Sequence, residues 1–428
     1  MQLWVLCLLF IGIGLSGPTA AQTWQADGNI KYRLVGTDFP KRSIFSDLVG
    51  DNTVDGALTS RLNFNLEFDH WSVDASYQIA GIHGDTIEYA QRHSSAGTQS
   101  LDIFTKDSVP DDNTRFIDLT EVVSDGSDYA VVHRLDRLVL GYHGEKNIFK
   151  VGRQAVSWGN GLIYTPMDFF NPFDPTAIDT EYKSGDDMLY AQHLFDNGND
   201  FQIVWVARRN EDQHSTREVN SIALKYHGFV GSWEFDLLAA DHYSDTIIGF
   251  GGAISIGGSV VRGDWVVTDT NEKLFHSFVT NISYAWIALD RNVTGSLEYF
   301  HNDFGVRIEK FGRADLADNL ALMKRFQRGE LFTLGRDYIA GSAVVEMVPL
   351  WVIITNIFYN LSDDSALTQL VSQHDLSQNI QFVAALSIPV GPRGTEFGGL
   401  EANNFNSESE LKYNESSWSI YAQLAWYF

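Results

Sequence analysis

The sequence predicts an all-β fold, a transmembrane antiparallel up-and-down β-barrel of about 18 strands, with 16 strands as the alternative count. Three observations lead to this prediction. Apolar and polar residues alternate in many short segments, short and long connections alternate between those segments, and the chain ends inside an apolar strand. Together they are typical of a barrel whose outer face meets lipid and whose inner face meets water.

The amino-terminal residues are typical of a leader for secretion. The segment Leu3–Leu15 is almost wholly apolar, and Thr19-Ala20-Ala21 follows it. We therefore expect a cleaved signal peptide over residues 1–21 and a single barrel domain over residues 22–428. A membrane anchor is the alternative, but the apolar core is shorter than the roughly 20 residues that a spanning helix needs. The only cysteine, Cys7, lies in this leader, so the predicted mature chain has no disulfide and no thiolate metal site.

Eighteen segments show the period-2 alternation of a strand with one apolar face. Leu62 and Leu66 share one face of such a segment, for example, whereas Asn63 lies on the other. The Gly-rich segment 246–257 and the segment 366–375 have the weakest patterns. The predicted strands are 24–34, 58–68, 71–79, 130–142, 148–158, 187–196, 201–209, 219–227, 232–242, 246–257, 260–268, 274–287, 292–301, 338–348, 351–361, 366–375, 379–390 and 417–428.

Two classes of connection alternate along the chain without a slip. The short class includes Asp69-His70 and Gly258-Ser259, and the other class includes the long segments 83–129, 159–186 and 302–337. Brief turns at one end of the barrel and longer loops at the other are the topology of an outer-membrane barrel. Within the last of these loops, residues 314–330 have helical spacing, so we expect a short packed helix there.

The last strand, Trp418–Phe428, closes the predicted barrel. Every second residue counted back from Phe428 is apolar, and aromatic residues stand at both ends of this face. An edge strand of a soluble β-protein is the alternative interpretation. The ending resembles that of Gram-negative outer-membrane barrels, and this resemblance implies recognition by the barrel-assembly machinery. Because an open sheet edge is not tolerated in lipid, this strand must pair with residues 24–34.

Composition and motifs exclude several function classes. The formal net charge of -25 argues against nucleic acid and anionic lipid surfaces as partners. No serine lies in a nucleophile-elbow pattern, and no two histidines show the spacing of a zinc-binding helix. Asp241-His242 and His374-Asp375 lie near strand ends, but such adjacent pairs are common by chance. We therefore expect no enzyme activity, no cofactor and no metal, and the sequence does not indicate an oligomeric state.

The segment Val151–Met188 departs from the barrel pattern. Three prolines lie between Pro166 and Pro175, and five aromatic residues cluster between Trp158 and Phe173. A loop this apolar has enough hydrophobic surface to bury itself, and the nearest wall is the barrel interior. We therefore predict that residues 159–186 fold into the lumen and narrow it. The alternatives are an external lid or a brace on the barrel.

The same segment carries a family resemblance. Gly152-Arg153-Gln154-Ala155-Val156-Ser157-Trp158-Gly159, followed by Asn171-Pro172, resembles the signature of uncharacterised porin-like outer-membrane proteins, the DUF1302-like group of putative porins among them. The resemblance covers roughly forty residues. It implies a porin-like barrel of the bacterial outer membrane with a structured inner loop, and it implies no substrate.

Charged residues on the predicted inner face and in the loop are the candidates for a constriction. Arg153 is ambiguous, because Phe149 and Val151 share its strand face. An arginine on the lipid face near the midplane costs about 2–4 kcal/mol, so we expect Gly152 to turn it inward, toward Asp168 or Asp174. The pore-lining and constriction candidates are Arg153, Asp168, Asp174, Asp179, Glu181, Lys183, Asp186, Asp187, Arg33, Arg61 and Arg208.

Two functions remain open at this stage. The first is a porin-like channel for passive diffusion of ions or small hydrophilic solutes, constricted by the 159–186 loop. The second is a non-conducting or plugged barrel that acts as a structural protein, a receptor or a component of an export or lipid-transfer assembly. Both have outer-membrane lipid as a partner, and only the first needs a continuous wet path.

Overall fold

The protein is a closed antiparallel barrel of eighteen strands in a computed structural model. The structure describes residues 22–94, 109–270, 272–307, 316, 318–402 and 412–428, so the expected signal peptide lies outside the described residues. The barrel strands are β1 (Gln22–Asp38), β2 (Asn52–Phe68), β3 (Trp71–Gly84), β5 (Tyr129–His143), β6 (Asn147–Gln154), β7 (Asp186–Leu194), β8 (Asp200–Val206), β9 (Ser221–Val230), β10 (Trp233–His242), β11 (Asp245–Ile256), β12 (Ser259–Asp269), β13 (Leu274–Ala288), β14 (Arg291–Asn302), β15 (Asp337–Val348), β16 (Trp351–Asn360), β17 (Ser365–Ser377), β18 (Ile380–Val390) and β21 (Trp418–Tyr427).

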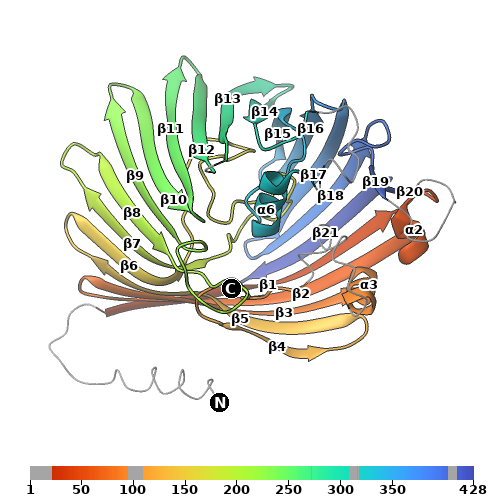
Figure 1. The fold of residues 1–428 in the computed structure, drawn as a ribbon, viewed down its shortest axis with the longest axis horizontal. Helices are drawn as coiled ribbons and strands as arrows, with labels where there is room; N and C mark the ends of the chain where they lie inside the picture. Colours follow the sequence, from red (N-terminus) through yellow and green to blue (C-terminus); the bar gives the residue numbers. More distant parts are fainter. Residues whose placement is uncertain (1–21, 95–108, 271, 308–315, 317, 403–411) are drawn as a thin grey trace.

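Closure is made by the first and last strands, which lie side by side in Figure 1. β1 pairs with β21 in antiparallel register from Asn29 opposite Tyr427 to Asp38 opposite Trp418. The backbone groups of Gly28 and Phe428 exchange two further hydrogen bonds of 2.9 and 3.0 Å. The predicted fold class and the predicted closing pair are therefore confirmed, because every barrel strand has a neighbour on both sides.

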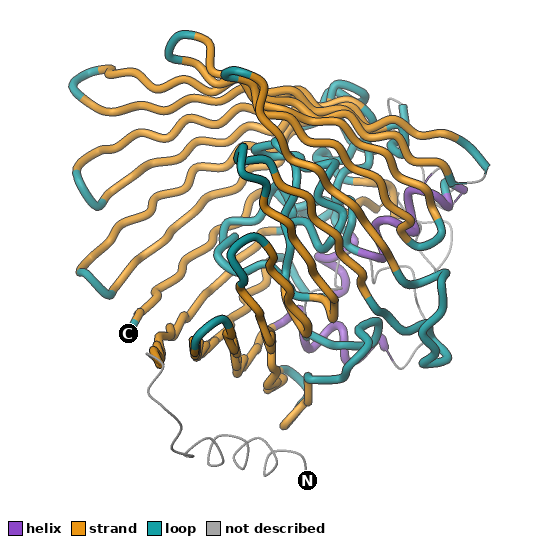
Figure 2. Tube along the Cα trace, turned by 90° about the vertical axis from the view of Figure 1, so that its left-hand side faces the viewer, coloured by secondary structure: helices purple, strands orange, loops and turns teal. Residues whose placement is uncertain are grey.

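Short turns and the carboxy terminus lie at one end of the barrel, the turn end, and the helices lie at the other, the loop end (Figure 2). The elements outside the ring are α2 (Ile44–Leu48), α3 (Asp85–Ser94), α6 (Leu320–Arg328) and the short strands β4 (Thr120–Asp125), β19 (Leu400–Ala402) and β20 (Lys412–Asn414). The helix expected within residues 314–330 is observed as α6, between the N-cap Asn319 and the left-handed Gly329. No helix among the described residues is long and apolar enough to cross a membrane.

Strand β6 is shorter than predicted, because the chain leaves the sheet after Gln154 rather than at residue 158. Gly152 has a φ of +123°, a backbone conformation that a side chain would strain. A Cβ at this position would also lie 2.0 Å from the carbonyl oxygen of Leu138. Where β6 ends, β4 continues the pairing with β5, from Thr120 opposite Arg134 to Asp125 opposite Ala130.

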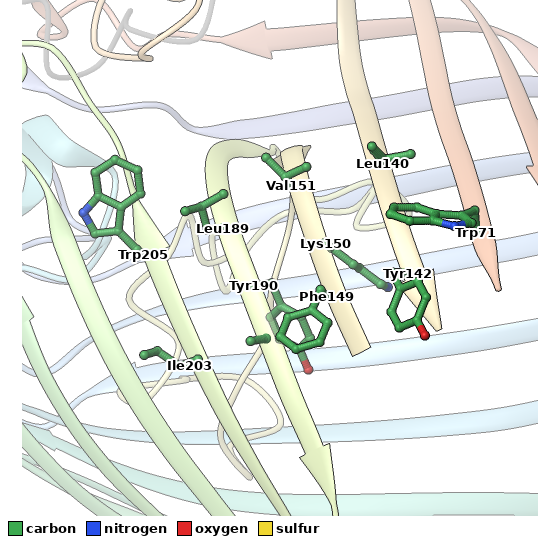
Figure 3. A pocket seen from close by; sticks show the side chains of 11 residues that line it. Trp71, Leu140, Tyr142, Phe149, Lys150, Val151, Leu189, Tyr190, Ile203 and Trp205 are labelled. Atoms are coloured by element: carbon green, nitrogen blue, oxygen red, sulfur yellow. The ribbon is translucent and has the colours of Figure 1, made fainter. Parts of the chain in front are cut away.

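The outer face is apolar, as a lipid-facing wall requires. An outer groove of about 570 Å³ shows this face at β3, β5, β6, β7 and β8 (Figure 3). Trp71, Val151 and Trp205 are 42%, 46% and 41% exposed and contribute to its lining. Val204 and Val206 flank Trp205 in sequence and are fully buried on the inner face. The two sides of β8 are therefore both apolar, which means that something covers its inner side.

Candidate functional site

That cover is the inner loop, residues 155–185, which connects β6 to β7 and lies inside the barrel. Trp158, Phe169 and Phe170 are buried against the inner side chains of β7–β12. The apolar inner-face partners are Met188, Val204, Val206, Ala223, Leu238, Ile247 and Val266. Burying one large apolar side chain stabilises a fold by about 1.5–3 kcal/mol, so this contact holds the loop firmly to one wall.

A second contact anchors the loop through its backbone. Glu298 on β14 is 1% exposed and accepts hydrogen bonds from the amide groups of Leu162, Ile163 and Tyr164 at 2.8, 3.1 and 2.7 Å. The Tyr164 ring also stacks on Phe300 of the same strand, with ring centroids 4.6 Å apart. One carboxylate therefore satisfies three loop donors that would otherwise be buried without partners.

A third contact explains the glycine-rich strand β11. Asp264 on β12 accepts hydrogen bonds from the amide and the side chain of Asn160, at 2.7 and 2.8 Å. A Cβ at Gly251 would lie 2.1 Å from Asp264 Oδ1, 2.8 Å from Asn160 Nδ2 and 3.0 Å from the sulfur of Met167. Glycine is needed in β11 because the loop backbone approaches the wall closely there.

The loop then crosses to the opposite wall, which β17, β18, β21 and β1 form. Gln369 on β17 donates to the carbonyl oxygen of Thr176 at 2.9 Å. Ile178 packs against a buried cluster made by Val371, Val383, Ala385 and Tyr421. Inner-face apolar residues on β17 explain why its sequence alternates poorly, since the loop covers them.

Lys31 on β1 holds the same part of the loop by charge. Its ammonium group lies 2.7 Å from Asp179 and 2.6 Å from Glu181. The phenol of Tyr427 also donates to Glu181 at 3.0 Å. Lys31 is 6% exposed, so these charge-assisted bonds compensate for its burial.

Asp168 and Lys183 pair with each other and tie the two arms of the loop together. The Lys183 ammonium contacts both carboxylate oxygens, at 2.5 and 2.7 Å, and also donates to the carbonyl oxygen of Val156. Burial raises the pKa of Asp168 to about 6, although the neighbouring ammonium opposes this shift. The buried ion pair therefore links the segment around Asp168 to the segment around Lys183 within the loop.

Arg153 is buried and paired, but its partners differ from those expected. It is 2% exposed and contacts Asp112 at 2.7 Å and Asp187 at 3.0 Å. The expected partner Asp168 is instead bound by Lys183, and the hydrogen bonds to Asp174 come from the amide and hydroxyl of Thr176. The correction follows from the short β6, because the chain leaves the sheet after Gln154, one residue beyond Arg153.

Replacing Arg153 with methionine is expected to destabilise the barrel more than replacing Arg153 and its two partners together. Methionine leaves Asp187 without an ion-pair partner and leaves Asp112 with only Arg115, and breaking a buried ion pair in this way costs about 3–5 kcal/mol. We expect a lower unfolding temperature for Arg153→Met, measured by loss of β-sheet circular dichroism on heating. The matched control is Arg153→Met/Asp112→Asn/Asp187→Asn, which removes the partner charges as well and leaves no unpaired charge at this position. Equal unfolding temperatures for wild type and Arg153→Met would contradict the assignment.

Most of the remaining candidates also form ion pairs that hold the loop or its ends. Arg208 binds Asp186 at 2.7 Å, and Arg61 binds Asp136 at 2.8 Å while its guanidinium lies 4.1 Å from the ring centre of Tyr182. Arg33 differs, since it is exposed and lines a cavity. The structure shows these ion pairs. That the eleven candidate residues together form one constriction of the pore is a proposal.

Two polar cavities flank the loop where it meets the opposite wall. The upper cavity, toward the loop end, has a volume of about 470 Å³, and the lower cavity, toward the turn end, about 430 Å³. Residues Ala177–Asp179, Gln369 and Tyr421 line both. The sequence candidates did not include Gln369, Tyr421 or Lys31. Lys31 lies on the polar face of the predicted strand 24–34, but strand alternation carries no sign that the residue borders a cavity.

Glu396 is a partly buried carboxyl in the loop after β18, at the upper cavity. It accepts hydrogen bonds from the hydroxyl of Tyr338, from the side chain of Asn360 at 2.8 Å and from the amide of Leu334 at 2.9 Å. Burial raises its pKa from about 4.5 to about 7. The group is therefore neutral in the folded protein at pH values where an exposed glutamate is ionised.

This raised pKa predicts a pH dependence of stability. Between pH 4.5 and 7 the folded state keeps a proton on Glu396 that the unfolded state has released. Stability therefore falls as the pH rises through this window, by an amount on the order of 3 kcal/mol, and the group has no further effect above it. Glu396→Gln should remove this component of the pH dependence of unfolding. The control is Glu272→Gln, at an exposed position, and the same pH dependence for wild type and Glu396→Gln would refute the prediction.

One group of residues has the composition of a hydrolase triad. Ser221 Oγ lies 2.8 Å from His242 Nδ1, and His242 Nε2 lies 3.0 Å from Glu330. Ser221 and His242 are each 2% exposed, and the serine hydroxyl also accepts a bond of 2.9 Å from Arg208. A nucleophile needs access to its substrate, and this hydroxyl is covered. The group instead joins α6's loop to the wall.

Comparison with known proteins supports the fold class. No protein family and no curated protein matches the sequence. Among solved structures, OccK5 (OpdH) of Pseudomonas aeruginosa has a TM-score of 0.54 at 8% identity and covers 94% of this chain and 98% of its own. OccAB4 of Acinetobacter baumannii has a TM-score of 0.51 at 7% identity, over 96% of this chain and 100% of its own. OpdQ of Pseudomonas aeruginosa has a TM-score of 0.51 at 7% identity, over 95% and 98%. At these identities the likeness concerns the fold, which is that of outer-membrane barrels of Gram-negative bacteria.

Proposed function

We propose that this protein is an outer-membrane channel for passive diffusion of ions or small hydrophilic solutes, narrowed by the inner loop. One observation carries the proposal: the loop crosses from the β7–β14 wall to the β17–β1 wall, and polar cavities remain on both of its sides. Two cavities along one wall, one toward each end of the barrel, are what a diffusion path interrupted by a constriction requires.

The structural likeness to the Occ and Opd barrels supports the fold on which this proposal depends. The DUF1302-like resemblance of residues 152–159 and 171–172 is a further part of the proposal, and it agrees with a porin-like barrel that has a structured inner loop. The proposed partners are outer-membrane lipid on the apolar outer face and the assembly machinery at the strand that ends in Phe428.

A plugged barrel is the second candidate, and the number of loop anchors favours it. Glu298, Asp264 and Lys31 each hold the loop from a different strand, so it does not leave the lumen easily. A barrel closed in this way would act as a structural protein, a receptor or a component of an export or lipid-transfer assembly. The two candidates share the fold and differ in whether the two cavities communicate.

Planar-bilayer recording of the purified, refolded protein distinguishes them. Discrete, stable conductance steps support the channel. Absence of steps from a preparation that is fully folded, as shown by altered gel migration before and after boiling, supports the plugged barrel. A preparation denatured by boiling is the control for detergent-induced leakage.

A further inference from the structure

We propose that solutes pass along the wall formed by β17, β18, β21 and β1, through the upper and lower cavities, and that this path takes uncharged, hydroxyl-rich solutes of monosaccharide size. The inference rests on the proposed channel function and adds the route, the gate and the solute class. The gate is the segment Ala177–Asp179, which forms part of both cavities.

The route follows from the shared lining. Gln369 and Tyr421 border both cavities, as does the gate segment, so these residues lie between the two cavities. Volumes of about 470 and 430 Å³ lie within the range of roughly 300–1,000 Å³ found for small-molecule sites. On the β7–β12 wall, in contrast, the loop packs apolar side chains directly on the strands and leaves a dry contact.

The solute class follows from the lining chemistry. Amide and hydroxyl groups make up most of the polar part of the lining, with Gln373, Gln381 and Gln423 in the lower cavity and Ser387, Ser416 and Ser419 in the upper one. Such groups both donate and accept hydrogen bonds, which suits hydroxyl groups of a solute. Tyr421 adds a ring surface beside them.

The charges along this path nearly cancel, although the whole chain carries -25. Lys31 neutralises part of the pair Asp179 and Glu181, and Arg33 adds a second positive charge. Glu396 is partly buried, and its pKa is raised to about 7, so it keeps its proton up to about that pH. A path without a dominant charge has little basis for sorting ions by sign, whereas the acidic loops alone would favour cations.

The gate has fewer anchors to the wall than residues 160–164 of the same loop. Lys31 binds Asp179, Ile178 packs on the wall, and Gln369 donates one hydrogen bond to Thr176 just before the gate. In contrast, the backbone amides of residues 160–164 donate five hydrogen bonds to the carboxylates of Glu298 and Asp264. Displacement of residues 177–179 alone would therefore join the cavities while the rest of the loop stays in place.

Cysteine substitution tests the route directly, because the only cysteine of the chain is Cys7. In a Cys7→Ser background, Ser419→Cys introduces a thiol into the upper cavity and Gln373→Cys into the lower one. The matched control is Gln192→Cys on β7, which lines neither cavity. Conductance and sugar efflux from proteoliposomes are compared before and after reaction with thiosulfonate reagents of either charge.

We expect modification of Ser419→Cys and Gln373→Cys to reduce conductance and arabinose efflux several-fold, and modification of Gln192→Cys to leave both unchanged. We also expect cationic and anionic reagents to react at Gln373→Cys at rates within a few-fold of each other. Block at Gln192→Cys alone would overturn the route, and a strong preference for one reagent charge would overturn the solute class. A folded wild-type protein without conductance would instead refute the proposed channel function.

Discussion

Removal of Trp426–Phe428 is expected to abolish formation of the closed barrel. The deletion removes the pairs of Tyr427 with Asn29 and of Trp426 with Ile30, together with the two backbone bonds between Gly28 and Phe428. It also exposes the turn end of β1 and of β18, which pairs with Trp426 through Ile380. Unpaired backbone groups in lipid cost several kcal/mol each, so the open edge would prevent insertion. The measurement is the fraction of protein that migrates as a folded band without boiling.

The control separates backbone closure from recognition of the aromatic ending. Trp426→Leu/Phe428→Leu keeps the strand length and changes only the side chains. Refolding of the purified protein into detergent micelles should succeed for this variant and fail for the deletion. Expression in cells should then show whether the leucine variant also reaches the membrane, which tests the role proposed for the assembly machinery. A deletion variant that refolds as well as wild type would disprove the closure argument.

Replacement of residues 160–182 by a short Gly-Ser linker is expected to increase conductance several-fold and to spare barrel closure. The strand pairs of β1, β2 and β21 involve none of these residues, so the wall is retained. The unfolding temperature should fall, because Met167, Phe169 and Phe170 no longer cover the apolar inner wall. Single-channel conductance and thermal unfolding of the same preparation measure both effects.

A point variant provides the matched test. Glu298→Ala removes the acceptor for three loop amides without shortening the chain, so it should loosen the loop and add noise or larger substates to the conductance. Glu346→Ala, on β15 and hydrogen-bonded to Asn292 near the turn end, is the control carboxylate. Unchanged conductance in the loop replacement would show that the loop does not limit the path.

The sequence predicted the wall well because strand alternation is local. Each strand repeats its pattern every two residues, and eighteen segments of this kind were located to within a few residues of the observed bounds, apart from β6 and the loop-end extensions of β1, β2 and β3. Alternation was weak in the predicted strands 246–257 and 366–375, and the structure gives the physical reasons. Glycines in β11 admit the loop near Gly251, and the inner face of β17 presents apolar Val371 to Ile178. Next to both strands, the inner loop rather than water occupies the lumen.

Strand alternation could not predict which residues contact one another inside the barrel. Lys31 and Asp179 are 148 residues apart in the chain, and Gln369 and Thr176 are 193 apart. Arg153 had several carboxylates within plausible reach, and the end of β6 at Gln154 decided that Asp112 and Asp187 bind it. The two-residue repeat of a strand carries no information about such long-range ion pairs and hydrogen bonds.

The sequence by itself predicted a closed membrane barrel of about 18 strands, its closing pair and a segment that enters the lumen. Only the tertiary structure decided which wall the loop covers, which charges neutralise one another and where the two cavities remain. The physical reason is the range of the interactions. Alternation and chain termini act between neighbours in sequence, whereas ion pairs and packing in the lumen depend on the curvature that brings β1, β14 and β17 around one interior.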